Sequence, residues 1–284
     1  MSLAVIDPVA FELGPLTVMW YGVIIAVGIV IALWLANREG ERLGYEEDFV
    51  LDAALWVIPF GFIGARLYYV LFELEYYLAN PASIIAIWEG GLAIYGGVIA
   101  GAITLIWYTK RRNKPIWLTL DIVTPSLLIA QAIGRWGNFV NQEAHGGEVS
   151  LEFLQNLHLP QFIIDQMYID GAYYHPTFLY ESLWNLLGFI LIVVLRRKKD
   201  FFNRGEVALS YVAWYAFGRF FIEGMRTDSL YLFNTPIRVS QALSFVLFFG
   251  AIAIAIYRRR NVFPAYKYNE GLAPEKRYEK KNKS

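Results

Sequence analysis

The sequence predicts an all-α polytopic membrane protein. Three observations predict this class: 57% of the 284 residues are hydrophobic, only 18% are charged, and the apolar residues come in long uninterrupted runs. A soluble domain carries about 25% charged residues. The mean hydropathy is +0.39 and the chain has no cysteine, which excludes a disordered chain and a disulfide scaffold. The net charge of zero gives no indication of a nucleic-acid partner.

Seven segments are long and apolar enough to cross a bilayer, whose hydrocarbon core of about 30 Å needs roughly 20 residues per helix. They are residues 17–36, 49–72, 92–109, 116–133, 177–195, 206–223 and 238–257. Each must be helical, because lipid offers no hydrogen-bond partner to an exposed backbone amide. We expect one seven-span domain over residues 1–260 and a charged, solvated cytoplasmic tail over residues 261–284.

The basic residues orient these spans. Of the 25 Lys and Arg residues, 20 fall in segments 37–48, 110–115, 196–205 and the tail after residue 257, all on one side of a seven-span chain. Short cytoplasmic loops are enriched in Lys and Arg. The carboxyl terminus is therefore expected in the cytoplasm and the amino terminus outside. Nothing basic precedes the first span, so it does not resemble a cleavable signal peptide.

Five arginines remain, and they lie within spans or at the outer ends of spans: Arg66, Arg135, Arg219, Arg226 and Arg238. An ionisable residue in a membrane is costly and indicates a functional site. The guanidinium group binds phosphate or carboxylate through two parallel hydrogen bonds. These arginines predict a site for an anion near the outer leaflet, most simply a lipid phosphate.

The longest outer segment, at about 134–176, lies between the fourth and fifth spans and is predicted to form a small head. It opens with GRWGNFVNQEAHGG, residues 134–147. Its four glycines predict a poor helix and a turn that lets backbone amides approach a ligand. The alternative is an ordinary glycine-rich turn that leaves a helix.

The end of the sixth span places further polar residues together. Helical spacing puts Tyr215, Arg219, Glu223 and Arg226 along one face. The Arg219–Glu223 pair is either part of an anion site or a structural bridge between two buried charges. Glu181 is either a buried partner for one of the arginines or faces a water cavity.

Neither a metal nor a cofactor is expected. His145 and His158 are predicted to be surface residues, because no HExxH motif or cysteine cluster accompanies them. The glycines of the third span, with Gly101 four residues after Gly97, are consistent with close helix packing.

Together these motifs resemble the prolipoprotein diacylglyceryl transferase family. The segment at 134–147 resembles the family signature G-R-x-G-N-F-x-N-x-E-x-x-G. The similarity extends to Trp20-Tyr21-Gly22, Tyr95-Gly96-Gly97, His175-Pro176 with Tyr180-Glu181, and Gly218-Arg219 with Glu223 and Arg226. These pieces run from the first span to the end of the sixth, and the resemblance covers nearly the whole chain up to about residue 260.

The resemblance implies a reaction in the bacterial cytoplasmic membrane. The enzyme would move diacylglyceryl from phosphatidylglycerol to the thiol of the lipobox cysteine in the signal peptide of a preprolipoprotein, forming a thioether and releasing glycerol phosphate. By position, Arg135 matches the phosphatidylglycerol-binding arginine of the family and Arg219 its second essential arginine. The resemblance also implies roles in activity or lipid binding for Tyr21, Asn138, Glu143, Gly146, Glu223 and Arg226.

One position departs from the family pattern. Well-known Gram-negative members carry His before the Gly-Gly of the third span, where this chain carries Tyr95. A tyrosine with a pKa near 10 is a poor base at neutral pH. We therefore expect Tyr95 to position the lipid phosphate or the thiol by hydrogen bonding, while the arginines or Glu143 assist deprotonation.

Two other classes of membrane protein share some of these features. An anion or lipid transporter would line its path with the same arginines, although here the polar residues gather at outer ends and the two halves of the chain show no repeat. A phosphatidyltransferase that uses a divalent metal would need clustered aspartates, whereas Asp52 and Asp121 stand alone.

Overall fold

The computed structural model describes residues 5–14, 16–227, 229–231, 235–261 and 266–272. The chain forms two compact units. The larger unit joins Met1–Ala36 with Leu120–Gly271, and the smaller unit joins Asn37–Thr119 with Leu272–Ser284. Helices of 18 residues or more dominate the described residues: α1 (Trp20–Arg42), α2 (Phe49–Phe72), α4 (Ile94–Arg111), α5 (Ile116–Val140), α8 (Thr177–Leu195), α9 (Glu206–Met225) and α10 (Val239–Asn261).

A helix covers most of each of the seven segments predicted from the sequence, although residues 17–19 of the first segment belong to a strand. Five of these helices, α1, α2, α5, α8 and α10, are long and apolar enough to cross a membrane. Charged residues lower the mean hydropathy of α4, which ends in Lys110 and Arg111, and of α9, which contains Arg219 and Glu223. The helical prediction is confirmed, and the crossing by α4 and α9 stays a prediction.

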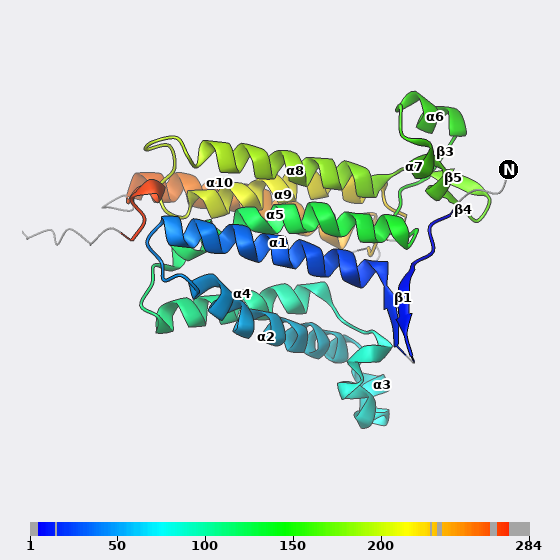
Figure 1. The fold of residues 1–284 in the computed structure, drawn as a ribbon, viewed down its shortest axis with the longest axis horizontal. Coiled ribbons are helices and arrows are strands. Elements are labelled where there is room, and N and C mark those ends of the chain that lie inside the picture. Colours follow the sequence, from blue (N-terminus) through cyan, green and yellow to red (C-terminus); the bar gives the residue numbers. More distant parts are fainter. Residues whose placement is uncertain (1–4, 15, 228, 232–234, 262–265, 273–284) are drawn as a thin grey trace, which may run out of the picture. The chain divides into compact units, whose positions relative to one another are not determined.

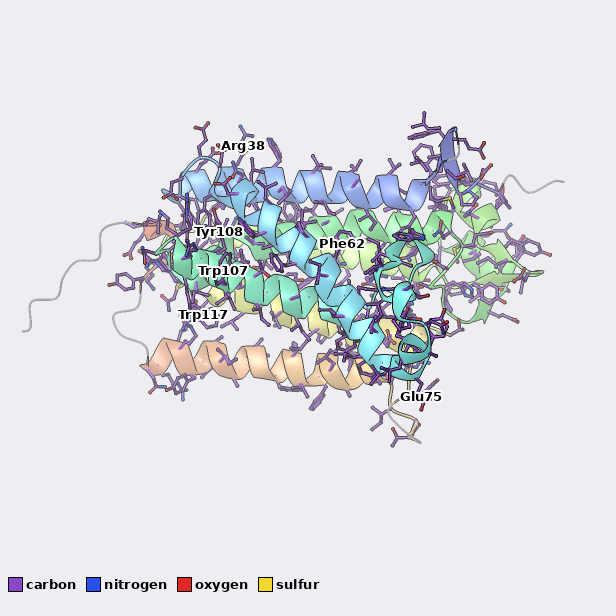
Figure 2. The ribbon with its side chains drawn as sticks, turned by 90° about the horizontal axis from the view of Figure 1, so that it is seen from below. Arg38, Phe62, Glu75, Trp107, Tyr108 and Trp117 are labelled. Atoms are coloured by element: carbon purple, nitrogen blue, oxygen red, sulfur yellow. The ribbon has the colours of Figure 1, made fainter. Side chains whose placement is uncertain are left out.

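The smaller unit is built on a close crossing of α2 and α4. A Cβ added to Gly64 would lie 2.8 Å from the carbonyl oxygen of Gly96, and a Cβ at Gly97 would lie 3.4 Å from the carbonyl oxygen of Gly61. Small residues let helix backbones approach in this way. The prediction that the glycines of this span serve helix packing is confirmed. Figure 2 shows Phe62 midway along α2, where its exposed side chain fits contact with lipid.

Short helices follow α2 at one end of the smaller unit: α3 (Leu74–Ala79), η1 (Pro81–Ile85) and η2 (Ile87–Glu89). Figure 2 places Glu75 at this end, while Arg38, Trp107, Tyr108 and Trp117 lie toward the other. The basic loops at 37–48 and 110–115 thus share one end of this unit.

Arg66 organises the short helices and is not an open anion receptor. Its side chain is 6% exposed. The guanidinium donates to backbone carbonyls of five residues, Ser83, Ile84, Ala86, Gly90 and Gly91, and lies over the ring of Tyr77. The expectation that Arg66 helps mark the phosphate site is corrected, because carbonyl oxygens of its own unit take up its donors.

The larger unit is a helical bundle with small sheets at one end (Figure 1). A two-stranded hairpin, β1 (Val9–Leu13) and β2 (Leu16–Met19), leads directly into α1. Between α5 and α8 the chain forms β3 (Glu148–Val149), α6 (Leu151–Asn156), α7 (Gln161–Gln166), β4 (Tyr168–Ile169) and β5 (Ala172–Tyr174). The three short strands pair antiparallel in the order β3-β5-β4. Sequence reasoning did not predict the first hairpin.

A compact apolar core holds the head segment on the bundle. It is formed by buried side chains of α5, α6, α7, Met167 and α8: Phe139, Leu154, Ile163, Ile164, Met167 and Phe178. Gln166 lies at its edge, fully buried. Its Nε2 donates to the carbonyls of Phe139 and Val140, and its Oε1 accepts from the backbone amide of Ile6. Gln166 thereby satisfies carbonyls that the end of α5 leaves without an intrahelical partner.

The first turns of the signature segment are helical, which corrects the prediction of a binding turn from residue 134. α5 continues to Val140, and the turn begins only at residue 141. The physical reason is packing against α1: a Cβ on Gly134 would lie 3.1 Å from Ile25, and one on Gly137 would lie 2.8 Å from the ring of Tyr21. Contact with α1 outweighs the low helix propensity of glycine, about 1 kcal/mol per residue relative to alanine.

The opposite end of the larger unit is fixed by buried charges. The carboxylate of Asp121 accepts from the backbone amides of Gly205 at 2.5 Å and Ala208 at 2.8 Å, and so caps the first turn of α9. Glu206 forms a bidentate ion pair with Arg259 of α10. These contacts join α5, α9 and α10.

Part of the tail is folded, so the prediction of a solvated extension is wrong for residues 266–272. Here η3 (Tyr268–Glu270) places a fully buried tyrosine against the loop that precedes α9. The amide of Tyr268 donates to the carbonyl of Phe202, and the ammonium of Lys267 donates to Asn203. The ring of Tyr268 supplies the buried apolar area that holds this segment, although most of the tail is charged. Residues 262–265 and 273–284 of the predicted tail lie outside the described residues.

Candidate active site

Four charged side chains from three helices meet near the head of the larger unit. Glu181 of α8 lies between two arginines: its Oε1 is 2.8 Å from Nη2 of Arg135, and its Oε2 is 3.3 Å from Nη1 of Arg219. Arg219 also pairs with Glu223 at 2.5 Å, one helical turn along α9. The predicted Arg219–Glu223 pair is confirmed, and of the two alternatives for Glu181 the buried arginine partner is correct.

The two carboxylates of this cluster are buried, whereas the arginines reach the surface. The side chains of Glu181 and Glu223 are 4% and 3% exposed, and those of Arg135 and Arg219 are 22% and 15% exposed. Two carboxylates thus balance two arginines, so this pair of arginines carries no unmatched charge. Each also keeps its Nε–H without a partner among the described side chains and backbone. The partly exposed guanidinium groups of Arg135 and Arg219 are accessible to an anion.

Two further arginines adjoin Glu223. The guanidinium of Arg238 and the backbone amide of Arg226 both donate to the carbonyl oxygen of Glu223. Arg238 thus adds a further guanidinium beside the buried Glu223, whereas Arg226 reaches Glu223 through its backbone. The predicted excess of positive charge in this region stays a prediction.

The polar cluster extends from α5 into the loop that follows it. Nη1 of Arg135 donates to Oδ1 of Asn138 at 3.1 Å, and Nδ2 of Asn138 donates to Oε1 of Glu143 at 2.8 Å. The backbone amide of Glu143 returns a hydrogen bond to the carbonyl of Asn138. Contacts therefore run without a break from Glu223 to Glu143, and Glu143 is the exposed end.

Gly146 ties this loop to the helices that carry the charges. Its amide donates to the carbonyl of His175, and its backbone forms an antiparallel bridge with Arg226. A Cβ at this position would lie 2.6 Å from Cβ of His175 and 3.2 Å from the carbonyl oxygen of Met225. Glycine is required here for close backbone approach. A nearby hydrogen bond from the hydroxyl of Thr177 to the carbonyl of Ala144 holds the same loop.

Tyr21 and Tyr95 come from different units. Tyr21, in the first turn of α1, packs its ring on Gly137, between the positions of Arg135 and Asn138 on α5, and stays 37% exposed. Tyr95 lies in the first turn of α4 in the smaller unit and is half-buried. The larger unit thus brings together Arg135, Arg219, Glu223, Asn138, Glu143, Gly146, Arg226 and Tyr21.

His175 is a polar residue that the predicted site set omitted. Its Nδ1 lies 3.3 Å from the hydroxyl of Tyr180, and its ring packs edge-on against Phe153. Burial lowers the pKa of His175, so the imidazole is neutral at neutral pH. The signal in the sequence was the His175-Pro176 pair, which formed part of the family resemblance but was assigned no role.

Comparison with known proteins decides the family. The family profile described as prolipoprotein diacylglyceryl transferase matches residues 8–257. The chain belongs to this family. Curated members named phosphatidylglycerol–prolipoprotein diacylglyceryl transferase are 57% identical in Lactobacillus acidophilus, with 96% of this chain and 97% of the relative covered, and 56% identical in Lactobacillus delbrueckii subsp. bulgaricus, with 99% and 100% covered. The relative from Enterococcus faecalis is 55% identical, with 92% and 94% covered.

Membership of the prolipoprotein diacylglyceryl transferase family and five long apolar helices make this a multi-pass membrane protein. The names of the relatives describe a transferase and give no support to the transporter alternative.

Proposed function

We propose that this protein transfers the diacylglyceryl group of phosphatidylglycerol to the thiol of the lipobox cysteine of a preprolipoprotein. It works in the bacterial cytoplasmic membrane, crosses it seven times, and has its amino terminus outside and its carboxyl terminus inside. One observation carries the proposal: two partly exposed arginines near the head, Arg135 and Arg219, both contact the buried carboxylate of Glu181. That arrangement suits an anionic phosphodiester ligand.

The reaction removes the thiol proton and replaces one carbon–oxygen bond with one carbon–sulfur bond. The cysteine thiol loses its proton, and the thiolate attacks the glyceryl carbon that bears the phosphate ester. A carbon–sulfur bond forms as the carbon–oxygen bond breaks, and the electron pair leaves with glycerol phosphate. The phosphate gains one negative charge during this step. Arg135 and Arg219 are held by Glu181 before the charge develops, so they stabilise the transition state more than the ground state.

The remaining residues of the cluster set geometry. Asn138 accepts a hydrogen bond from Nη1 of Arg135 and so helps to fix the orientation of that guanidinium. Tyr21 and Gly146 shape the approach to these donors, and Glu223 and Arg226 fix the position of Arg219 and of the loop. Tyr95 positions the phosphate or the thiol by a hydrogen bond, and Glu143 or the arginines assist removal of the thiol proton.

A transfer assay tests the proposal. The purified protein is incubated with phosphatidylglycerol and a peptide that contains a lipobox with one cysteine, and the peptide is weighed by mass spectrometry. We expect the peptide to gain the mass of one diacylglyceryl group. Arg135→Ala and Arg219→Ala should each abolish this gain, whereas Arg111→Ala, an exposed arginine of the smaller unit, should leave it unchanged. A wild-type protein that gives no mass gain would refute the transferase proposal.

A second comparison tests the role of Tyr95. Tyr95→Phe removes one hydrogen bond of about 0.5–1.5 kcal/mol, so we expect a loss of roughly 2- to 13-fold in turnover. Full activity of Tyr95→Phe alongside inactive Glu143→Gln would show that Tyr95 does not position either substrate.

A further inference from the structure

A second feature of the larger unit lies far from the head. α9 and α10 pack along each other, and a groove of about 260 Å³ runs between them at the end that carries the basic tail. A water molecule takes up about 30 Å³ of liquid, so the groove has room for much more than one water. Its walls are apolar, with Leu209 and Ala213 from α9 and Ala251, Ala255 and Ile256 from α10.

The groove opens where side chains are exposed. Ile252 and Ile256 on α10 are 38% and 49% exposed, whereas Ala251 at the base is buried. α10 is one of the five helices that are long and apolar enough to cross a membrane. From Ala251 to Arg259 the lined stretch of α10 extends for roughly 12 Å, because an α-helix rises about 1.5 Å per residue. An acyl chain of a bilayer lipid has room to lie along this apolar groove.

One end of the groove is polar, because the ion-paired Glu206 and Arg259 both line it and the exposed Arg260 lies beyond them. Arg259 lines it, and its guanidinium is held by Glu206 and by the carbonyl of Phe201 through Nε and Nη2. Nη1 of Arg259 has no partner within the described part of the chain, and the side chain is 57% exposed. Arg260 is exposed and lies one helical turn beyond Ile256. The Glu206 ion pair fixes the Arg259 guanidinium, so Nη1 is presented at a set position.

We propose that this groove is a binding site for one anionic phospholipid, separate from the transfer site. One acyl chain lies against Ala213, Ala251 and Ala255, and the phosphate binds Nη1 of Arg259 together with Arg260. A basic pocket between helices at the cytoplasmic surface is a recognised arrangement for anionic head groups. Charge complementarity selects an anionic over a zwitterionic lipid, and the apolar walls select a lipid over a free phosphate.

Photolabelling of the full-length protein tests this site. The protein is placed in lipid nanodiscs with a trace of phosphatidylglycerol that carries a diazirine on its acyl chain, or with the matching phosphatidylcholine, and no peptide substrate is added. After illumination, labelled residues are mapped by mass spectrometry. We expect the phosphatidylglycerol probe to label residues 209–213 and 251–256 at least 5-fold more than the phosphatidylcholine probe. Equal labelling by the two probes would overturn the proposal and identify the groove lipid as ordinary bilayer lipid.

Matched variants locate the probe. Ala255→Phe fills the groove, and Ala253→Phe makes the same change at an exposed position on the same helix. Labelling by the phosphatidylglycerol probe should fall at least 5-fold in Ala255→Phe and stay unchanged in Ala253→Phe. Arg260→Gln should lower it toward the phosphatidylcholine level, and Arg260→Lys should restore it. Undiminished labelling in Ala255→Phe would refute the groove as the site. Arg135→Ala should retain the labelling, which separates this site from the proposed transfer reaction.

Discussion

At the scale of single residues, Glu181 links the two arginines on which the proposed chemistry depends. It is buried, and its two carboxylate oxygens contact different guanidinium groups. Breaking a buried ion pair by removing one partner costs about 3–5 kcal/mol, because a charge stays buried without compensation. Here the arginine side chains are 22% and 15% exposed, so solvent recovers part of that cost.

Glu181→Gln therefore should destabilise the protein and impair transfer together. We expect a loss of about 2 kcal/mol in stability, seen as a lower melting temperature in detergent, and at least a 10-fold loss of transfer. Glu143→Gln, at the exposed end of the same cluster, should leave the melting temperature unchanged. A Glu181→Gln protein with wild-type stability and activity would show that the shared carboxylate has no role in holding the arginines.

The stability of the folded protein is expected to depend on pH through His175 in the head segment. Burial lowers its folded-state pKa below the ordinary value near 6.5, so the unfolded chain binds more protons than the folded chain between these two pKa values. The contribution of the neutral His175 to the free energy of unfolding is therefore fully present above about pH 6.5. This contribution is lost as the pH falls from 6.5 toward the lower pKa of the folded state.

The measurement is the melting temperature between pH 5 and pH 7. Wild type should lose stability on acidification more steeply than His175→Gln, because the variant cannot take up that proton. His158→Asn changes an exposed histidine and should keep the wild-type slope. Identical slopes for wild type and His175→Gln would exclude His175 as the titrating group.

At the scale of elements, α8 and α9 are joined by a reciprocal tryptophan contact. The indole rings of Trp184 and Trp214 stack at 4.3 Å, and each Nε1–H donates to the backbone carbonyl of the other residue. Each ring covers a glycine on the opposite helix, Gly188 or Gly218. Because Gly218 directly precedes Arg219, this contact also positions a charged residue of the candidate site.

Gly218→Ala should therefore damage both packing and activity. The added Cβ would lie 2.9 Å from Cε2 of Trp184, and overpacking of this kind costs about 1–3 kcal/mol. Gly250→Ala in α10 meets no atom within 4 Å and should be neutral or stabilising by up to about 1 kcal/mol. Thermal unfolding in detergent and the transfer assay give the two readouts. Equal stability of the two variants would show that the tryptophan contact tolerates a side chain.

Helix positions were predictable from the sequence, whereas partners across space were not. Apolar runs located each long helix because a span must satisfy its own backbone. Residues 134–140 were misjudged because glycine propensity says nothing about the surface of α1 that packs there. Arg66 shows the same limit. Its position within a predicted span indicated a costly buried charge, and only the fold shows that backbone carbonyls within residues 83–91 accept hydrogen bonds from its guanidinium.

Within the candidate site, the signature motif identified the residues but not their pairing. Arg135, Asn138 and Glu143 belong to one segment, and their spacing was visible in the sequence. The contact of Glu181 with both arginines joins positions 46 and 38 residues apart, a relation that local periodicity does not encode. His175 lies in a matched motif but was assigned no role, because its contact with Phe153 is not visible in the local sequence.

At the scale of the whole molecule, the proposed topology can be tested directly because the chain has no cysteine of its own. Single cysteines at the exposed positions Asn80 and Asn156 should react with a membrane-impermeant maleimide on intact cells. Cysteines at the exposed positions Arg111 and Lys199 should react only after the membrane is opened. Labelling of Arg111→Cys on intact cells would contradict the proposed orientation of α4.

The hydrogen bond between Ile6 and Gln166 has a consequence for synthesis of the chain. The two residues are 160 positions apart, and Gln166 also closes the end of α5. At about 5–20 residues per second, ribosomes need roughly 8–32 s to make the intervening chain. Throughout that interval Ile6 lacks this partner, while residues 37–119 of the smaller unit are made. The segment around Ile6 is thus made well before the residue that holds it in place.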